Sequence, residues 1–393
     1  MIVPGFTAAG SAAGIKKQGG LDLALIYADV PVSAAGVFTR NRVKAAPVML
    51  CRERLRGGKA QAILVNSGNA NACTGPQGLA DARATSRELA RLLKIPERLV
   101  LPASTGVIGQ PLPGAKITGA LPELVARLRP DGLPEVARAI MTTDTRPKTA
   151  FLQEKIGGKK FNLAGIAKGA GMIHPDLATL LVFVFTDAAV SPEVLKSLLR
   201  QALPVSFNRI TVDGDTSTND TILFLASGQA GNPVIAAPGP EMAALGAVLN
   251  QVMGDLARQV VADGEGATRV FRVEVEAAAS PKEALNAART VALSPLVKTA
   301  MAGADVNWGR IMAALGRSGA RFDPEKVEIA FGRHLVVKNG QGLGPAAEAA
   351  AQKVILAGPF TVTIHLQAGS ASDYYDTCDY TEDYIRINAS YRS

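Results

Sequence analysis

The 393-residue chain contains few of the residues from which metal sites, disulfide frameworks and nucleic-acid platforms are built. Its three cysteines, Cys51, Cys73 and Cys378, are far apart and odd in number, and its three histidines are equally scattered. This spacing predicts no metal site and no disulfide framework, and it is typical of a protein of the reducing cytoplasm. Aromatic residues make up only 5 %, and no more than two basic residues are adjacent. Nucleic-acid binding is therefore not expected.

Long apolar runs are missing as well. No stretch approaches the roughly 18 residues of a membrane span, so no membrane association is expected. The N-terminal segment lacks a basic region and is interrupted by Pro4 and several glycines, which predicts that it is no signal peptide. Hydrophobic residues nevertheless make up 48 % against 19 % charged, enough for a sizeable core. The net charge of +8 predicts a positive field that attracts small anionic substrates.

Strand-like and helix-like segments alternate along the chain, with short connections and no internal repeat. The apolar patterns predict strands at 22–29, 61–68, 98–105, 180–185, 269–277 and 360–367. They predict helices at 78–94, 191–202, 240–262, 281–293 and 345–356. This alternation favours a layered α/β or α+β fold without a flexible hinge. The Gly-, Asn-, Ser- and Thr-rich loops after several strands are where such folds usually carry their chemistry.

Thr179 is the most unusual candidate residue, because it directly precedes the apolar run "LLVFVF". One interpretation is a β-branched residue that merely begins a strand. The other is a nucleophile: a hydroxyl needs a base, and cleavage of the bond between Ala178 and Thr179 would free an α-amine on the same residue. Such an amine has a pKa of about 7.7–8.0, which suits a base at neutral pH. The turn "GAGMIHPDLA" would present that bond for attack.

Two small-residue segments are candidates for holding an oxyanion or an anionic substrate. In "LPASTGVIGQPLP", residues 101–113, a turn at Ser104, Thr105 and Gly106 could aim a hydroxyl and a backbone N–H at one point. The alternative is an ordinary polar loop. "NSGNANACTG", at 66–75, gives a weaker indication of a positioning loop before a helix. "NGQGLG", at 339–344, lacks the spacing of a dinucleotide site.

Two acidic segments have both a structural and a functional interpretation. "TVDGDTSTND", at 211–220, lacks the glycine and glutamate spacing of a calcium loop, so a hydrogen-bonded turn is favoured over a cation site. In "VADGEGATR", Glu265 lies between two glycines at a helix end. It belongs either to a surface turn or to a site that receives a substrate ammonium group.

Together these segments resemble the ornithine acetyltransferases, or bifunctional glutamate N-acetyltransferases, of arginine biosynthesis. The resemblance spans nearly the whole chain. It is carried by "GFTAAGSAAGIK", "AAGVFTRNRVKAAPV", "MTTDTRPK", "KGAGMIHPDLATLL", "SFNRITVDGDTSTND", "SPLVKTAMAGADVNWGRI" and "YDTCDYTEDYIRINASYRS". It implies a DmpA/ArgJ-like layered α/β (α+β) fold, with helices flanking two β-sheets and a smaller lobe.

The resemblance also implies a set of site residues. The precursor would cut itself between Ala178 and Thr179, into an α chain (1–178) and a β chain (179–393), and Thr179 would carry the acetyl group. Thr105 and Gly106 match the oxyanion hole. The matches to substrate-binding positions are Thr142, Lys168, Thr179, Glu265, Asn388 and Ser393. Two departures are mild: "LATLL" stands where the family commonly has "MATML", and Ser393 stands where threonine is common.

The implied reaction is a ping-pong transfer of acetyl from N-acetylornithine to glutamate. It implies no metal and no cofactor, with acetyl-CoA as a candidate additional donor, and an α2β2 heterotetramer in the cytoplasm. Two alternatives stay open. One is a self-processing N-terminal-nucleophile aminopeptidase or amidase, in which water takes the acyl group. The other is a ligand-binding protein that never cleaves itself.

Overall fold

The computed structural model describes residues 1–174 and 180–390, which form two compact units. Unit 1 comprises residues 1–208 and 215–260, and unit 2 comprises 209–214 and the described residues from 261 onward. This division reflects compactness and does not test the expected chain break, since residues 175–179 lie outside the described part. Every helix in that part is too short or too polar to span a lipid bilayer.

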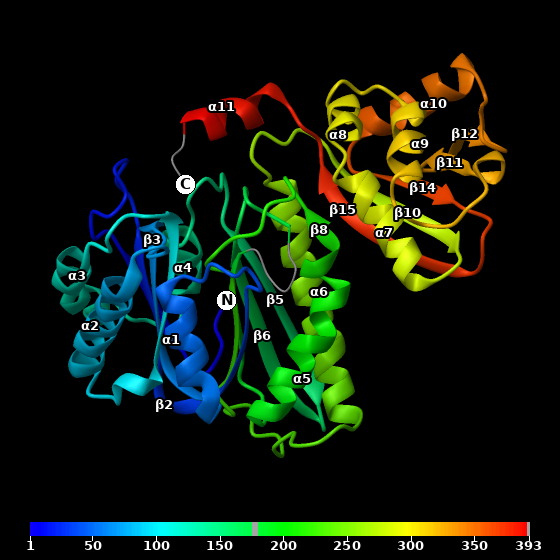
Figure 1. The fold of residues 1–393 in the computed structure, drawn as a ribbon. Helices are drawn as coiled ribbons and strands as arrows, with labels where there is room; N and C mark the ends of the chain where they lie inside the picture. Colours follow the sequence, from blue (N-terminus) through cyan, green and yellow to red (C-terminus); the bar gives the residue numbers. More distant parts are fainter. Residues whose placement is uncertain (175–179, 391–393) are drawn as a thin grey trace. The chain divides into compact units, whose positions relative to one another are not determined.

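Unit 1 contains most of the elements, coloured blue to green in Figure 1. Its strands are β1 (Thr7–Ser11), β2 (Leu23–Phe38), β3 (Lys59–Asn69), β4 (Val100–Val107), β5 (Lys148–Ile156), β6 (Lys159–Lys168), β7 (Leu181–Thr186) and β9 (Thr221–Ala226). Its α-helices are α1 (Ala46–Arg54), α2 (Gly75–Leu93), α3 (Gly114–Ala126), α4 (Leu133–Ala139), α5 (Pro192–Ala202) and α6 (Pro240–Ala262). Its 3₁₀ turns are η1 (Leu55–Gly57), η2 (Glu97–Leu99), η3 (Leu203–Val205) and η4 (Phe207–Arg209).

A sharp irregularity in β2 divides the sheet of unit 1 into two layers. The strand order is β4-β3-β2-β9-β7-β6-β5, with β1 paired to β2. The first half of β2 pairs with β3 and the second half with β9, and the register shifts between Tyr27 and Val32. Residues 29–31 are exposed at this bend. The apolar pattern predicts a short strand at 22–29, whereas β2 runs from Leu23 to Phe38. The apolar pattern is interrupted at the bend, but the strand continues beyond it.

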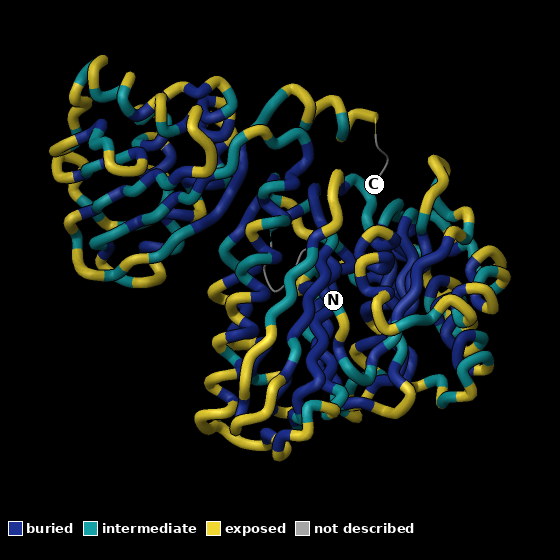
Figure 2. Tube along the Cα trace, turned by 180° about the vertical axis from the view of Figure 1, so that it is seen from behind, coloured by how far each residue is buried: buried dark blue, intermediate teal, exposed yellow. Residues whose placement is uncertain are grey.

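The core of unit 1 lies between the two layers. Apolar residues from β2, β3 and β4, such as Ile26, Ile63 and Leu101, share one cluster with Phe183 and Phe185 of β7. All six residues of β7 are buried, which explains its unbroken apolar sequence. Figure 2 shows the strands of unit 1 largely in the colour of buried residues.

Helices cover the outer faces of both layers. A second cluster joins Leu25 and Leu64 of the first layer to Leu89 of α2 and Leu121 of α3. On the second layer α5 packs against β2 and β9, and Gly165 of β6 faces α6. Figure 1 shows α2 and α3 on one side of the strands and α5 and α6 on the other. The expected fold of helices flanking two sheets is confirmed.

Unit 2 is a separate sheet with helices. Its strands are β8 (Ile210–Thr211), β10 (Val270–Ala278), β11 (Glu328–Phe331), β12 (His334–Lys338), β13 (Gln341–Gly342), β14 (Phe360–His365) and β15 (Ala371–Cys378). Its helices are α7 (Pro281–Ala292), α8 (Pro295–Ala302), α9 (Trp308–Gly316), η5 (Pro324–Lys326), α10 (Pro345–Ala357) and α11 (Glu382–Ser390). The order of strands is β13-β12-β11-β14-β10-β15-β8.

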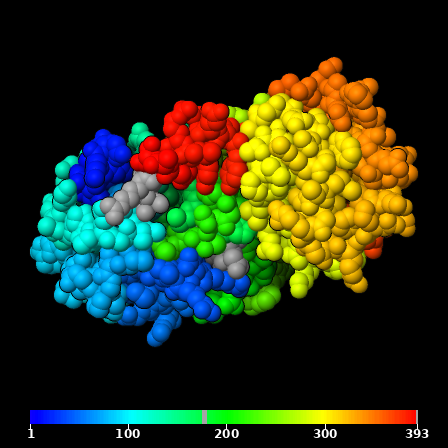
Figure 3. All heavy atoms as spheres, turned by 45° about the horizontal axis from the view of Figure 1, so that its top comes forward, coloured from blue at the N-terminus to red at the C-terminus, as the bar shows by residue number. Residues whose placement is uncertain are grey.

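The strands of unit 2 bury one face. Burial alternates along β10, where Val273 and Val275 pack in a cluster with Ala288 and Val291 of α7. This alternation is typical of a sheet covered by helices on one side. The yellow and orange residues of unit 2 form one continuous packed surface in Figure 3.

Several helices begin where the sequence predicts. Ser191, Ser280 and Ser294 each accept a hydrogen bond from the backbone N–H three residues later, and each is followed by a proline at the first helical position. The predicted helix at 240–262 has the bounds of α6, and α2 begins three residues before the predicted start at 78. The helices expected at 191–202 and 281–293 are confirmed as α5 and α7, whereas α8 was not predicted.

Candidate active site

The structure distributes the predicted site residues over both units. Thr105, Gly106, Thr142 and Lys168 belong to unit 1, whereas Glu265 and Asn388 belong to unit 2. Three further predicted residues, Ala178, Thr179 and Ser393, lie outside the described residues. The roles of all nine remain predictions, and the arrangement around the described ones is given below.

The strand register places the unit 1 candidates at one end of the layers. In the second layer Phe38 pairs with Thr221, Thr221 with Leu181, and Leu181 with Lys168. Leu181 is the first residue of β7, two positions after Thr179. The strand that follows the candidate nucleophile thus begins beside the candidate substrate-binding lysine.

Thr105 and Gly106 lie inside β4, so the expectation that they form a turn after a strand is wrong. β4 pairs in parallel with β3, where Gly106 is opposite Gly68 and a bulge follows at Asn69. Gly106 has φ +129°, and a Cβ there would lie 2.3 Å from the backbone carbon of Gly68. Only glycine fits such a position. Bulges of this kind redirect a strand near its end, which gives Thr105 and Gly106 their special geometry.

Asparagine side chains hold this strand end in place. Asn66 accepts a hydrogen bond from the Ser104 hydroxyl at 2.6 Å and donates to Asn69 O at 2.9 Å. Asn219 donates to Ser104 O at 2.8 Å and to Ala70 O at 2.6 Å. Because Asn219 lies two residues before the start of β9 in the second layer, its hydrogen bonds connect the two layers beside Thr105. The segment 66–75 therefore positions other residues, as its sequence indicated.

Asp144 connects Thr142 to the residue after Lys168. Its carboxylate accepts hydrogen bonds from Lys148 Nζ at 2.6 Å, Gly169 N at 2.7 Å and Thr142 N at 2.9 Å. The side chains of Asp144 and Lys148 are both fully buried. Burial alone would raise the pKa of Asp144, but the Lys168 and Lys148 cations lower it to about 2. The carboxylate therefore stays charged and fixes two candidate segments relative to each other.

Lys16 is a further cation near these residues. Buried Asp22 accepts hydrogen bonds from the N–H groups of Ala13, Ile15 and Lys16, which shapes their loop. That loop lies over Gly68, since a Cβ on Gly68 would be 3.2 Å from Lys16 Cγ. Burial lowers the pKa of Lys16, and Asp22 and Asp144 partly oppose this change. Lys16 belongs to the quoted "GFTAAGSAAGIK", but its sequence gave no indication of this placement.

Asp220 differs from the other carboxyls of the site. It is fully buried, and neither carboxylate oxygen has a hydrogen-bond partner within the described part of the chain. The Thr39 hydroxyl nearby donates to Ser217 O at 2.9 Å, and the Ser217 hydroxyl accepts from Asn219 N at 3.1 Å. Burial raises the pKa of Asp220 well above its usual value, against the weaker opposing effects of these hydroxyls and Lys168.

The segment 211–220 is a turn between strands, as the sequence favoured. It connects β8 with β9, and its residues are divided between the two units. Residues 1–174 and 180–390 contain no group of three His, Cys, Asp or Glu side chains placed to hold a metal ion.

Glu265 and Asn388 meet within unit 2. Glu265 follows the end of α6 and is mostly buried, and Asn388 Nδ2 donates to its Oε2 at 2.8 Å. Gly266 has φ +69°, and a Cβ there would lie 2.5 Å from Tyr384 N, so α11 packs directly on this turn. The two residues that were predicted separately, 123 positions apart, thus share a hydrogen bond.

Comparison with known proteins agrees with these observations. The ArgJ family model matches residues 7–393. The chain is 49 % identical over 393 residues to the arginine biosynthesis bifunctional protein ArgJ of Geobacter sulfurreducens, and 47 % identical over 393 residues to that of Desulfotalea psychrophila, with 100 % of each chain covered in both comparisons. The crystal structure of the Bacillus halodurans ArgJ protein matches with 41 % identity and a TM-score of 0.50, covering 52 % of this chain and 96 % of that chain.

These matches and the two helix-flanked sheets define an acyltransferase with a mixed α/β fold. The chain belongs to the ArgJ family. The resemblance inferred from the sequence motifs is thereby confirmed, as is the enzyme class.

Proposed function

We propose that the protein transfers the acetyl group of N-acetylornithine to glutamate through an acetyl-threonine intermediate. The bond between Ala178 and Thr179 is first broken by the chain itself, giving chains 1–178 and 179–393 that stay associated as an α2β2 heterotetramer. The freed amine of Thr179 then takes the proton of its own hydroxyl. The hydroxyl attacks the acetyl carbonyl, ornithine leaves, and the amine of glutamate takes the acetyl group.

The other residues have assigned roles in this proposal. Thr105 and the Gly106 N–H stabilise the oxyanion. Lys168 binds a substrate carboxylate and Glu265 the cationic end of ornithine, while Thr142, Asn388 and Ser393 complete the pocket. No metal and no organic cofactor takes part. Acetyl-CoA is a candidate additional acetyl donor, and the enzyme works in the cytoplasm.

The main support is the strand register in unit 1. β7 begins at Leu181 beside Lys168, at the end of the layers where the segment 217–220 also holds Ser104, the neighbour of Thr105. Thr179 is two residues before Leu181 in the sequence, so this register supports a nucleophile that works together with Lys168, Thr105 and Gly106. The match with the Bacillus halodurans structure covers 96 % of that chain but only 52 % of this chain. The Bacillus halodurans chain is therefore about half as long, which is compatible with a precursor that is split in two.

The first experiment compares intact masses of the wild type, Thr179→Ala and Thr179→Ser after denaturation. We expect two fragments from the wild type, the second beginning with Thr179, and an uncut chain of 40.8 kDa from Thr179→Ala. Thr179→Ser keeps both hydroxyl and amine, so it should still cut. An uncut wild type would overturn the proposal and favour a ligand-binding protein.

Acceptor specificity separates acetyl transfer from hydrolysis. The purified wild type would be given N-acetylornithine with and without glutamate, and both ornithine and N-acetylglutamate would be measured. Release of ornithine that depends on glutamate supports transfer. Equal release without glutamate would favour the aminopeptidase or amidase alternative, in which water accepts the acyl group.

A further inference from the structure

Unit 1 carries an open groove with a strong excess of positive charge, called the basic groove here. Its volume is about 1020 Å³, at the upper end of the range of small-molecule sites. Within the described part of the chain its lining includes one acidic side chain, Glu193. The basic side chains that line it are Arg40, Lys44, Arg52, Arg56, Lys196 and Arg200.

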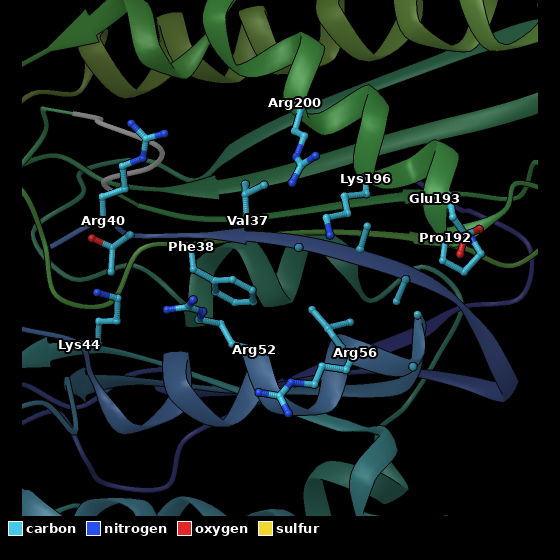
Figure 4. A pocket seen from close by; sticks show the side chains of 17 residues that line it. Val37, Phe38, Arg40, Lys44, Arg52, Arg56, Pro192, Glu193, Lys196 and Arg200 are labelled. Carbon is cyan, nitrogen blue, oxygen red and sulfur yellow. The ribbon is translucent and has the colours of Figure 1, made fainter. Parts of the chain in front are cut away.

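Three elements of unit 1 build the basic groove. The second half of β2 forms its floor, α1 and η1 form one wall, and α5 forms the other (Figure 4). One end is closed where Gly58 meets α5, since a Cβ on Gly58 would lie 2.6 Å from Pro192 Cβ. Gly36 in the floor has no room for a side chain, because a Cβ would be 2.8 Å from Leu55 Cδ1.

Four cations of the two walls have no carboxylate partner among the described residues. Among the described residues, no carboxylate lies within ion-pair distance of Arg52, Arg56, Lys196 or Arg200. By contrast Arg54, on the same helix as Arg52, pairs with Glu97 at 2.6 Å.

The spacing of these cations makes their like charges neighbours. Lys196 and Arg200 are four residues apart on α5, and like charges at this spacing destabilise a helix. Arg52 of α1 and Arg56 of η1 lie close together in sequence on the other wall. In Figure 4 Lys196 and Arg200 extend from α5 toward β2. The surplus of positive charge in the basic groove indicates an anionic ligand.

The floor of the basic groove adds an apolar surface to this charge. Val37 and Phe38 are only partly buried and lie between the two walls (Figure 4). An aromatic ring flanked by cations suits a planar base or another apolar body attached to phosphates. A simple inorganic anion would leave this surface unused.

Phe38 and Arg40 line the end of the basic groove that lies at the same end of the layers as the candidate residues of unit 1. Phe38 pairs with Thr221, which pairs with Leu181. Thr39, between Phe38 and Arg40, donates through its hydroxyl to Ser217 O at 2.9 Å. A ligand held in the basic groove can therefore extend toward the start of β7.

We propose that the basic groove binds the phosphate groups of a nucleotide-type polyanion, whose organic body lies on Val37 and Phe38. Two sources share this chemistry: a nucleotide-bearing acetyl donor and a free nucleotide that acts as a regulator. The binding itself does not depend on the reaction proposed above. Its role as a donor site does rest on that proposal.

The test is titration calorimetry with coenzyme A, ATP and inorganic tripolyphosphate, at low and at 0.3 M salt. The groove variants are R52Q/R56Q and K196Q/R200Q, all at exposed positions. The control is K159Q/K160Q, which removes two exposed lysines at the start of β6 outside the lining. We expect roughly tenfold weaker binding of coenzyme A and ATP by each groove variant, because contacts between cations and phosphates are lost. The control should bind both with the affinity of the wild type.

Further arms separate the sources and the macromolecular alternative. A higher KM for acetyl-CoA in the groove variants, with an unchanged KM for N-acetylornithine, identifies a donor site. A change of N-acetylornithine turnover by ATP, lost in the groove variants, identifies a regulator site. Equal affinities of groove and control variants, or binding of single-stranded RNA far tighter than of either nucleotide, would overturn the proposal. Absence of acetyl transfer in the wild type would refute the proposed reaction but leave the binding result intact.

Discussion

Asp144 and Asp220 are both buried carboxyl groups of unit 1, yet their surroundings are opposite. Asp144 accepts three hydrogen bonds and lies beside Lys148 and Lys168, which lower its pKa to about 2. The carboxylate oxygens of Asp220 have no hydrogen-bond partner in the described part of the chain, and burial raises the pKa of this carboxyl. Burial alone therefore does not decide whether a carboxyl group is charged. The hydrogen-bond donors and cations around it decide this.

The two regions therefore contribute differently to the protein. A compensated carboxylate such as Asp144 connects segments, here those of Thr142 and Lys168, and its removal leaves a buried cation behind. An uncompensated carboxyl such as Asp220 costs stability at neutral pH and is retained despite this cost. Groups of the second kind concentrate near functional sites, and Asp220 adjoins the segment that holds Ser104.

The largest effect is expected for Asp144→Ala. It leaves the Lys148 ammonium group buried without its carboxylate and frees the N–H groups of Thr142 and Gly169, so we expect a loss of about 3–5 kcal/mol in the free energy of unfolding. Urea denaturation measures it. The control is Asp131→Ala, which removes an exposed ion pair with Arg129 and should cost about 1 kcal/mol or less. Similar losses for both variants would show that the buried pair has no special weight.

The pH dependence of stability should separate the two carboxyls next. The folded pKa of Asp144 is depressed from 3.8 to about 2, so its stabilisation is present above pH 3.8 and is lost as the pH falls toward 2. This loss amounts to roughly 2 kcal/mol, at 1.36 kcal/mol per pKa unit. The folded pKa of Asp220 is raised, so its contribution is complete below pH 3.8 and is lost as the pH rises through the folded value.

Stability curves from pH 2 to 7 for the wild type, Asp144→Asn and Asp220→Asn would check this. Asp144→Asn should flatten the acid limb, whereas Asp220→Asn should remove a decline toward neutral pH. Identical slopes in all three proteins would contradict the contrast between the two groups.

The smallest effect is expected for Asp220→Asn at neutral pH. The amide removes a buried ionisable group without changing its volume, so we expect a gain of about 0.5–2 kcal/mol in the free energy of unfolding. Asp187→Asn is the matched control, because buried Asp187 accepts hydrogen bonds from Asn162 N and Asn162 Nδ2, both at 2.6 Å, and its replacement should destabilise. Destabilisation by both substitutions would show that Asp220 has partners that stabilise its charge.

Much of the fold could be predicted because its signals are local. The helices α5 and α7, which begin with Ser-Pro pairs, and the apolar stripe of α6 depend on residues a few positions apart. The bend in β2 could not be predicted, because it depends on β3 and β9 pairing with different halves of one strand. Thr105 and Gly106 were read as a turn for the same reason: their strand character comes from the partner strand β3.

The candidate site was predicted in part. The motifs singled out Thr142 and Lys168 but not Asp144, which lies inside the quoted "MTTDTRPK" and holds both segments. Lys16 and the cations of the basic groove were not predicted either, since isolated basic residues carry no sequence signal. Glu265 and Asn388 were predicted individually, and only the fold shows that they are hydrogen-bonded.

From the sequence alone follow the family, the layered class of fold, the helices α2, α5, α6, α7 and α10 and the buried strand that follows Thr179. These features depend on residue order and hydrophobic period, which act over short distances along the chain. The tertiary structure was needed to show which carboxyl stays charged, which glycine has no room for a side chain and which cations lie together in the basic groove. Each of these depends on groups far apart in sequence, and electrostatic and steric effects act through space.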